Sequence, residues 1–419
     1  MAAVATPGHI FPILDIGKYL VAQGHQVTVL TGELFRERSE TIGAKFVPFD
    51  ARVDFDYRHL EEHFPQRAAL PPGNAQMALA LKDFFAAPIP LLHQQLLAVI
   101  KAEAIDVVII ENGFYGVLPL LQLKERPVVF GVGVTPLPYS SRDSVFYGPR
   151  IAPALLPYDL SREQLVDKET QTLIDEVQQS FNVALELSGG SALRLPFTDA
   201  LIAGCDSFFQ LSTAALEYAR DDLPQNLHFI GALKGSGKSV VRNIGWDQSD
   251  SRPLVVVTQG TIANVDFNQL IIPTLNALAQ LPVRILVTTG GREVDGLIDK
   301  LPANAKVQQF ISFDDWFGQA SLFITNGGYG TINQALEYGV PLIIAGVGED
   351  KQEAAMRIVA AGCGINLRTS YPSEAQLLEA ATRILQQPSY RQRAELIQAD
   401  YARHDPLATI AADVLAFTR

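Results

Sequence analysis

The sequence predicts an α/β protein of two domains, each built on a parallel sheet with helices on both faces. Short apolar segments alternate with segments of helical spacing along the chain, which is typical of parallel sheets. The alternation is interrupted once, by a polar stretch rich in Gly and Ser, and then begins again. With 419 residues, 48% of them hydrophobic and 19% charged, the chain can bury two sizeable cores and is too apolar for disorder.

The first half begins with a very short predicted strand, Ala2 to Thr6, which Pro7-Gly8-His9 ends. Ile10 to Gln23 has the apolar spacing of a helix. Ser140 to Pro157 is rich in Pro, Ser and Tyr and predicts a long loop of the kind that carries binding groups. Further strands are predicted at 26–30, 46–48, 106–110, 128–131, 205–211 and 227–230, and further helices at 91–101 and 163–187.

The second half repeats the pattern after a linker predicted at 234–252. Within the linker, Gly235 to Ser239 resembles the end of a phosphate loop, but Ala232 stands where that motif needs its first glycine. The predicted domains are 1–233 and 253–405, and 406–419 is a C-terminal helix that could pack back on the first domain. Strands are predicted at 254–257, 283–287, 307–310, 322–325 and 342–345, and helices at 267–280 and 332–338.

The charge of the chain argues against a nucleic-acid partner. The formal net charge is -12 and the sequence pI is about 5.1, so the surface repels phosphate backbones. A phosphorylated ligand must therefore be held locally, by backbone amides or a few side chains. The two cysteines, Cys205 and Cys363, form neither a disulfide framework nor a metal-ligand cluster, and their apolar or Gly-rich surroundings predict buried, inert thiols.

The N-terminus has no basic stretch followed by an apolar run, as a signal peptide would have. No uninterrupted apolar run approaches the roughly 18 residues that span a bilayer. We therefore expect a soluble cytoplasmic protein without stable membrane insertion, present as a monomer or homodimer. The brevity of the first strand suggests that the chain starts a few residues late.

The strongest local signal is the glycine-rich turn from Asn326 to Thr331, with glycines at 327, 328 and 330. It follows an apolar strand and opens a helix. Glycines let a ligand approach the backbone, and the free N–H groups at a helix start favour an anion. A tight strand-to-helix turn without a ligand is equally compatible with this motif alone.

Two further turns follow strands of the same half. Gly260 and Thr261 come after the strand at 254–257, and Asp350 and Lys351 lie in the turn after 342–345. In parallel sheets, ligands gather outside the carboxyl ends of the strands, so these turns could face one diphosphate and its sugar. The alternatives are a simple β–α turn for the first and a helix-capping Asp350 for the second.

In the first half, His9 follows the first strand and Glu111 follows the strand at 106–110. The pKa range of histidine suits a general base, and a carboxylate beside it can orient the ring and stabilise its charged form. A structural histidine and a solvated glutamate at the strand end are the alternatives.

Together these motifs resemble the family 1 glycosyltransferases of the GT-B fold, in particular the bacterial natural-product and macrolide-type enzymes. Gly8-His9-Ile10-Phe11-Pro12 is similar to the family's G-H-x-x-P turn, and Gly24 to Thr28 to its G-H-x-V-T strand. The donor-site signature resembles Asn326 to Thr331, followed by Gln334-Ala335-Leu336 and Gly339-Val340-Pro341. Asp350 and Gly362 to Ile365 complete a pattern that spans the chain.

The resemblance implies two Rossmann-like parallel-sheet domains facing a central cleft, and a role for each matching residue. His9 would be the base that deprotonates the acceptor hydroxyl, supported by Glu111. Phe310 and the backbone of Ile311 would lie against the nucleobase. Gln334 would lie at the ribose, and Asp350 and Lys351 at the sugar hydroxyls. The diphosphate would be held by Gly260, Thr261, Gly328, Gly330 and Thr331.

Four positions depart from the family pattern. Asn326 replaces a histidine that often contacts the diphosphate, so the diphosphate-binding turn of this chain carries less positive charge. Gln334 stands for a glutamate, and Lys351 for a glutamine, which makes glucose less secure as the donor sugar. Glu111 stands for an aspartate and places its carboxylate one methylene further out.

The sequence thus predicts an inverting, metal-independent glycosyltransferase without a cofactor, whose partners are a nucleotide diphosphate sugar and a small, apolar, hydroxylated acceptor. By family resemblance, uridine is preferred over thymidine in the donor. A sugar-nucleotide epimerase or hydrolase of the same fold, or a non-catalytic sugar-nucleotide-binding subunit, are the alternatives. Aromatic residues of the first half could line an acceptor pocket or form core: Phe55, Phe64, Phe84, Phe85, Tyr115, Tyr139, Phe146 and Tyr147.

Overall fold

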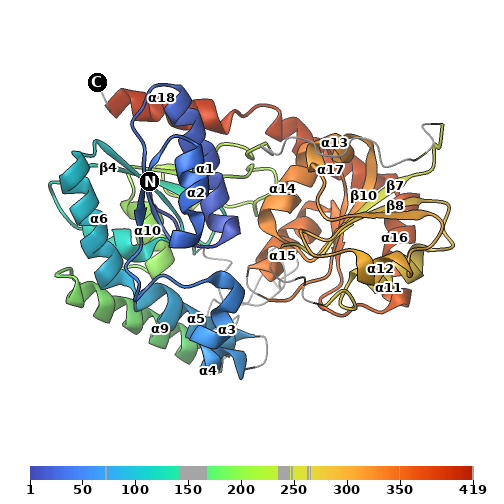
Figure 1. The fold of residues 1–419 in the computed structure, drawn as a ribbon, viewed down its shortest axis with the longest axis horizontal. Helices are drawn as coiled ribbons and strands as arrows, with labels where there is room; N and C mark the ends of the chain where they lie inside the picture. The colour runs from blue at the N-terminus through green and yellow to red at the C-terminus, as the bar shows by residue number, and fades with distance from the viewer. Residues whose placement is uncertain are drawn as a thin grey trace.

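The computed structural model describes residues 1–70, 73–140, 168–234, 246, 249–261, 264, 266–348 and 350–417. Most of the predicted loop at 140–157, the start of the helix predicted at 163–187 and most of the linker with its Gly235–Ser239 segment lie outside these residues. Figure 1 shows the described chain as two halves, each with strands between helices.

The first half contains a parallel sheet whose order changes direction once. Residues 1–4 run between two groups of strands, because Ala2 bridges both Leu30 and Ile110. The order is β2, β1, the N-terminal segment, β3, β4, β5, β6, and the change of direction lies between the N-terminal segment and β3. The strands are β1 (Thr28–Thr31), β2 (Lys45–Pro48), β3 (Val107–Glu111), β4 (Val128–Gly133), β5 (Ser207–Gln210) and β6 (Leu227–Phe229).

The second half contains a six-stranded sheet in the order β12-β11-β10-β7-β8-β9. Every pairing in it is parallel. This is the doubly wound order in which a crevice opens where the direction changes, here between β7 and β10. The strands are β7 (Leu254–Thr258), β8 (Arg284–Thr288), β9 (Ala305–Gln308), β10 (Ala320–Thr325), β11 (Leu342–Ile344) and β12 (Gly364–Asn366).

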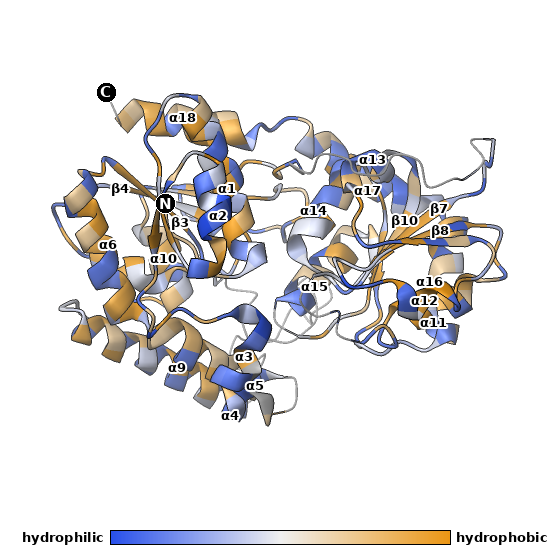
Figure 2. Cartoon of the chain, viewed as in Figure 1, coloured by the Kyte–Doolittle hydropathy of each residue, from blue (hydrophilic) through white to orange (hydrophobic). Residues whose placement is uncertain are grey.

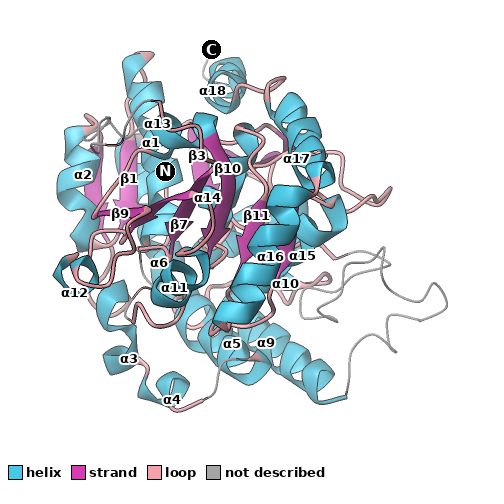
Figure 3. Ribbon diagram, turned by 90° about the vertical axis from the view of Figure 1, so that its right-hand side faces the viewer, coloured by secondary structure: helices cyan, strands magenta, loops and turns pink. Residues whose placement is uncertain are grey.

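Helices connect the strands and cover the sheets, as the view in Figure 3 also shows. Those of the first half are α1 (Pro7–Ala22), α2 (Arg36–Thr41), α3 (Leu60–His63), α4 (Pro65–Ala68), α5 (Asn74–Ala80), α6 (Ile89–Glu103), α7 (Leu118–Leu121), α9 (Lys168–Leu187) and α10 (Phe197–Gly204). Those that follow are α11 (Ile271–Leu278), α12 (Asp295–Ile298), α13 (Phe313–Trp316), α14 (Tyr329–Glu337), α15 (Lys351–Ala361), α16 (Glu374–Gln386), α17 (Pro388–Tyr401) and α18 (Pro406–Phe417). Single turns are η1 (Glu33–Phe35), η2 (Tyr57–His59), η4 (Tyr115–Val117) and η6 (Phe317–Gln319), and η3 (Leu81–Ala86) is a π-helical segment.

The ends of several helices follow from local chemistry. Pro7 stands in the first turn of α1, where its missing N–H costs no helical bond. Gly362 ends α15 with φ of +71°, a left-handed conformation that glycine adopts without a Cβ penalty. Ser373 and Gln376 form a reciprocal capping box at the start of α16.

Apolar strands fill the interior of both halves, as the hydropathy colouring of Figure 2 shows. Every residue of β7 is buried, as expected for a central parallel strand with helices on both faces. The first half has one large core, and the second half has one core on each face of its sheet.

The last helix returns to the first half. Ile410 and Val414 of α18 are buried in the core of that half, where α18 contacts α1. The ring centroid of Phe417 lies 5.8 Å from that of Phe130 in β4. In Figure 1, α18 (red) accordingly lies beside the blue helices of the N-terminal half.

One described helical stretch, Asn74–Glu103, is long and apolar enough to cross a membrane by length and composition alone. The stretch is not a continuous apolar run, because Lys82 and Asp83 interrupt it. A core helix passes the same test, and Leu81, Ile89 and other residues of this stretch are buried in the core of the first half.

The predicted fold class is confirmed, and the predicted strands match observed strands with small shifts at their ends. In place of the strand predicted at Ala2 to Thr6, the structure has two bridges of Ala2, one to Leu30 and one to Ile110. Helix α1 begins at Pro7, so His9 lies in its first turn and not before the helix. Strand β12 was not predicted, because Gly364–Asn366 is too short for a pattern to appear. The predicted domain boundaries stay a prediction.

Candidate functional site

His9 and Glu111 meet where the order of the first sheet changes direction. Nδ1 of His9 lies 2.7 Å from Oε2 of Glu111. The His9 side chain is 22% exposed and the Glu111 side chain is 0% exposed. If Nδ1–H donates to the carboxylate, Nε2 carries the lone pair and can accept a proton.

The carboxylate of Glu111 is fixed by the backbone on both sides. The N–H of Val4 donates to Oε1 at 2.9 Å, and the N–H of Gly113 donates to Oε2 at 2.6 Å. A side chain at Gly113 would crowd the pair, since a Cβ there would lie 3.1 Å from Glu111 Oε2 and 3.2 Å from His9 Cε1. The longer side chain therefore still reaches His9, although it replaces the aspartate expected from the resemblance.

The two glycine turns of the second half lie together at the change of direction between β7 and β10. Nδ2 of Asn326, after β10, donates to the carbonyl oxygen of Gln259, after β7, at 2.5 Å. Asn326 is 8% exposed, and a Cβ on Gly260 would lie 3.1 Å from its Nδ2. Asn326 thus holds the two turns to each other, a role that its sequence position alone did not indicate.

Helix α14 starts directly behind this junction. Gly328 is its N-cap residue and no side chain caps it, so first-turn N–H groups stay available to a ligand. Gly327 has φ of +100°, a conformation that favours glycine. Thr331 Oγ1 donates to Gly328 O at 2.9 Å and stabilises the turn, and nothing lies within 4 Å of a Cβ built on Gly330.

The turn that contains Asp350 and Lys351 contacts the glycine-rich turn from Asn326 to Thr331. A Cβ on Gly327 would lie 3.3 Å from Cβ of Lys351, so Lys351 packs against the glycine turn. Lys351 is 9% exposed. Asp350 occupies the N-cap position of α15, but its side chain makes no capping hydrogen bond, so capping does not account for this aspartate.

The predicted nucleobase residues lie at the carboxyl end of β9. Phe310 is 59% exposed, and a Cβ on Gly291 would lie 2.6 Å from Cζ of its ring, so the ring packs against the Gly291 backbone. Ile311 and Thr331 are half-buried, as is Gln334 on α14, whereas Thr261 is exposed.

Sequence analysis missed two residues at this edge. Asn264 is 1% exposed, and its Nδ2 donates to Gly260 O at 2.8 Å and to Thr289 O at 2.6 Å. Its Oδ1 accepts from Arg292 Nε at 2.7 Å, so Asn264 connects this guanidinium to the carbonyl oxygen of Gly260. The signal was available, because Gly290-Gly291-Arg292 follows strand β8.

Five of the aromatic residues predicted for the acceptor pocket or core form a continuous cluster: Phe55, Phe64, Phe84, Phe85 and Tyr115. Ring centroids lie 4.9 Å apart for Phe55 and Phe64 and for Phe84 and Phe85, and 6.0 Å apart for Phe85 and Tyr115. Tyr115 is buried in the core, and the four phenylalanines are half-buried. Tyr139 stands apart under Arg220, and Phe146 and Tyr147 lie outside the described residues.

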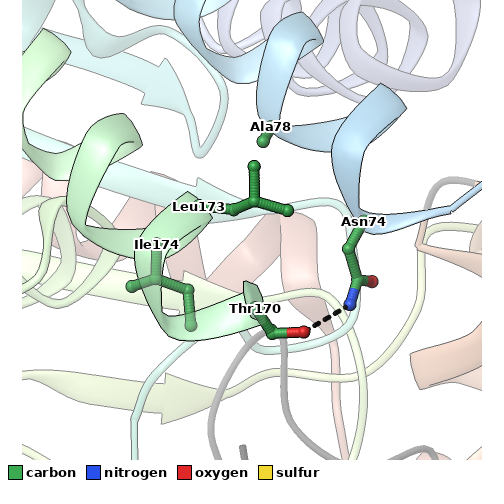
Figure 4. A pocket seen from close by; sticks show the side chains of 5 residues that line it. All are labelled: Asn74, Ala78, Thr170, Leu173 and Ile174. Atoms are coloured by element: carbon green, nitrogen blue, oxygen red, sulfur yellow. Dashed lines mark hydrogen bonds between the residues drawn. The ribbon is translucent and has the colours of Figure 1, made fainter. Parts of the chain in front are cut away.

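A small hollow near this cluster lies between α5 and α9 (Figure 4). Asn74 Nδ2 donates to Thr170 Oγ1 at 3.1 Å across it, and Ala78, Leu173 and Ile174 line the rest. The hollow is too small to hold a substrate.

Among the described residues, no three His, Cys, Asp or Glu side chains gather to hold a metal ion. Cys205 and Cys363 are both buried and unpaired, and burial raises the pKa of each thiol to about 12. The prediction that both thiols are buried is confirmed, and the raised pKa of each disfavours the reactive thiolate.

The chain is 33% identical to UDP-glycosyltransferase 2 of Phaeomoniella chlamydospora, over 99% of this chain and 94% of that protein. It belongs to the family 1 glycosyltransferases. It is a glycosyltransferase enzyme, and the chemistry of this family is sugar transfer from a nucleotide sugar. It is also 29% identical to the 4'-demethylrebeccamycin synthase of Lentzea aerocolonigenes, over 97% of this chain and 96% of that protein.

Further matches agree with this assignment. Residues 273–417 of the glycosyltransferase match the C-terminal domain model described as erythromycin biosynthesis protein CIII-like. The crystal structure of the glycotransferase of kitacinnamycin superposes with a TM-score of 0.73 at 20% identity and covers 99% of this chain and 97% of that one. The likeness establishes the GT-B fold.

Proposed function

We propose that this glycosyltransferase moves a sugar from a UDP-sugar to a hydroxyl group of a small, largely apolar acceptor, with inversion at the anomeric carbon. The choice of a UDP-sugar as donor is supported by the relative named a UDP-glycosyltransferase, which matches over nearly the whole chain. An apolar acceptor is supported by the half-buried phenylalanine cluster around Phe55 and Phe84.

The observation that carries the proposed mechanism is the 2.7 Å contact between His9 and Glu111. His9 Nε2 accepts the proton of the acceptor hydroxyl while the hydroxyl oxygen bonds to the anomeric carbon. The bond from that carbon to the diphosphate oxygen breaks, and its electron pair leaves with the diphosphate. Glu111 stabilises the imidazolium that forms, because its carboxylate faces Nδ1.

The leaving diphosphate gains negative charge, which the start of α14 can stabilise. The helix dipole and the N–H groups from Gly328 onward favour an anion there. Lys351 packs against the same turn and supplies a positive charge that Asn326 does not. We propose that these groups act without a metal ion, so turnover that falls on chelation with EDTA would contradict this part.

The test is the variant His9→Ala, assayed with UDP-sugars and a panel of small phenols and apolar alcohols. We expect kcat to fall about 10²- to 10⁴-fold, the usual contribution of a general base. The Kd for UDP, measured by calorimetry, should change less than about twofold, because UDP is held by the second half.

His59→Ala is the matched control. His59 Nδ1 also lies 2.9 Å from a glutamate, Glu62, but both side chains are exposed. We expect its kcat to be unchanged. Wild-type turnover in the His9 variant would remove His9 from the mechanism, and absence of calorimetric binding of any nucleoside diphosphate would refute the proposed function as a whole.

A further inference from the structure

Helix α15, which begins at Lys351, is joined to the first half by a buried arginine. Arg357 is 3% exposed. Its Nε donates to Oε2 of Glu217 at 2.9 Å, and its Nη2 donates to the carbonyl oxygen of Leu137 at 3.1 Å. Leu137 follows β4 and Glu217 follows β5, so one guanidinium contacts two segments of the other half.

The ion pair of Arg357 and Glu217 is buried and has further partners. The guanidinium carbon of Arg357 lies 4.7 Å from the ring centroid of Tyr218, and Nη1 donates to Oε2 of Glu353 at 3.1 Å. Burial lowers the pKa of Arg357, but Glu217, Tyr218 and Glu353 outweigh it and hold the pKa above its ordinary value. A buried charge of this kind is stable only while its partners stay in place.

On the first-half side, the arginine is connected to the His9 site. The loop that contains Leu137 is held by Asn112, whose Nδ2 donates to Thr135 Oγ1 at 2.8 Å. Asn112 Oδ1 also accepts from the N–H of Val134 at 2.9 Å. Asn112 directly follows Glu111, the partner of His9.

On the side of the second half, helix α15 connects Arg357 to the glycine-rich turn from Asn326 to Thr331. It lies six residues after Lys351 in α15, which is about 9 Å along the helix. The start of that helix packs against Gly327, as described above. Arg357 thus lies between the two parts of the site.

The other donor helix, α14, is joined to the first half in the same way. Asn333, four residues after Tyr329, is 3% exposed, and its Nδ2 donates to the carbonyl oxygen of Leu211 at 3.2 Å. The hydroxyl of Tyr401 donates to Asn333 Oδ1 at 2.6 Å and fixes the amide. Arg357 of α15 therefore contacts the loops after β4 and β5, and Asn333 of α14 contacts the loop after β5.

We propose that Arg357 is a positioning residue for glycosyl transfer, which sets the placement of the donor-bearing helix α15 relative to His9 by joining it to the loop after β4. This rests on the proposed function, since it needs the acceptor base in one half and the donor in the other. Its loss should impair transfer while the second half still binds the nucleotide.

The experiment compares Arg357→Lys with the wild type by measuring kcat and the Kd for UDP. Lysine keeps the positive charge but has no planar fork, so it cannot contact Glu217 and Leu137 together. We expect kcat to fall at least about tenfold and the Kd for UDP to change less than about twofold. The acidic limb of the kcat pH profile should keep its position, because the base itself is unchanged.

Arg391→Lys is the matched control. Arg391 also contacts two carbonyl oxygens, of Ala320 and Tyr338, and a glutamate, but all of these lie in the second half. We expect it to keep the wild-type kcat. If Arg357→Lys does not fold, Glu217→Gln replaces it. We expect the same fall in kcat and the same small change in the Kd for UDP.

An unchanged kcat in the folded variant would overturn the proposal, and so would a loss of UDP affinity as large as the loss of kcat. These outcomes differ from failure of the proposed function. If the proposed function failed, the wild type would transfer no sugar, or His9→Ala would retain full turnover.

Discussion

At the scale of single residues, the site depends on a few buried polar side chains that each join two segments. Glu111 accepts from Val4, Gly113 and His9, and Asn326 donates across the two glycine turns. A carboxylate with several N–H donors is held in one rotamer, so the imidazole beside it is oriented before a substrate arrives.

Asn326 gives a prediction at this scale. Asn326→Ala removes the bond to Gln259 O that holds the two turns together. A net contribution of about 0.5–1.5 kcal/mol for one hydrogen bond corresponds to a UDP Kd raised roughly 2- to 12-fold. Calorimetric titration with UDP measures this change.

Asn304→Ala serves as the control. Asn304 is 7% exposed and also donates its Nδ2 to a backbone oxygen, that of Leu278, but it precedes β9 and so lies at the amino edge of the sheet. The Asn304→Ala variant should be less stable than the wild type and bind UDP with unchanged affinity. Equal effects of the two variants on the Kd would show that Asn326 has no specific role at the donor turns.

At the scale of elements, α14 connects the donor turn to the interior of the second half. Its first residue, Tyr329, is buried, and its last, Glu337, is half-buried. Oε2 of Glu337 is buried and has no hydrogen-bond partner among the described residues. Burial, with Asp314 adding to it and Lys234 opposing it, raises the pKa of Glu337 from 4.5 to about 7.

This shift makes the stability of the enzyme depend on pH. Between about pH 4.5 and 7 the folded state keeps the proton on Glu337 while the unfolded chain has lost it, so stability falls as pH rises through that window. Glu337→Gln mimics the protonated form. We expect it to match the wild type at pH 5 and to be more stable at pH 8 by about 1–2 kcal/mol, after allowance for solvent screening.

Thermal unfolding of wild type and Glu337→Gln at both pH values measures this difference. Glu379→Gln, at an exposed position of α16, is the control and should show no pH-dependent difference. A stability gain of the same size at pH 5 and pH 8 would refute the assignment to Glu337.

At the scale of the whole molecule, two kinds of contact join the halves within the part of the chain that the structure describes. The loops after β4 and β5 contact α15 and α14, and the C-terminal helix α18 returns from the second half to the core of the first. The placement of the two halves is thus set by buried contacts on the site side and by an apolar helix elsewhere (Figure 1).

Ile410→Ala tests the return of α18. Ile410 is 0% exposed in the core of the first half, so its truncation should lower the free energy of unfolding by about 2–5 kcal/mol. Leu415, 47% exposed on the same helix, is the control, and Leu415→Ala should change stability by less than about 0.5 kcal/mol. Chemical denaturation measures both, and equal small effects would show that α18 does not pack on the first half.

Much of this organisation could be predicted from the sequence, because local patterns reflect local forces. Apolar runs such as Leu254–Val257 must be buried strands, and a glycine-rich turn before a helix such as Gly327–Gly330 favours an anion wherever it lies. The GT-B fold and sugar transfer were implied by the resemblance of these motifs to the family 1 glycosyltransferases, and both are confirmed.

Other features could not be predicted, because they depend on which distant segments meet. Asn333 and Arg357 carry no local motif, and their roles come from contacts with residues far along the chain. The sequence by itself determined two parallel-sheet domains, a glycine-rich turn before a helix and a histidine after the first apolar segment, since these follow from periodicity, glycine content and the order of residues along the chain. Only the tertiary structure decided that Glu111 faces His9, that Asn326 joins the two glycine turns, and that Arg357 joins the halves. These are pairings across 67 to 220 residues, and the packing of the sheets selects them.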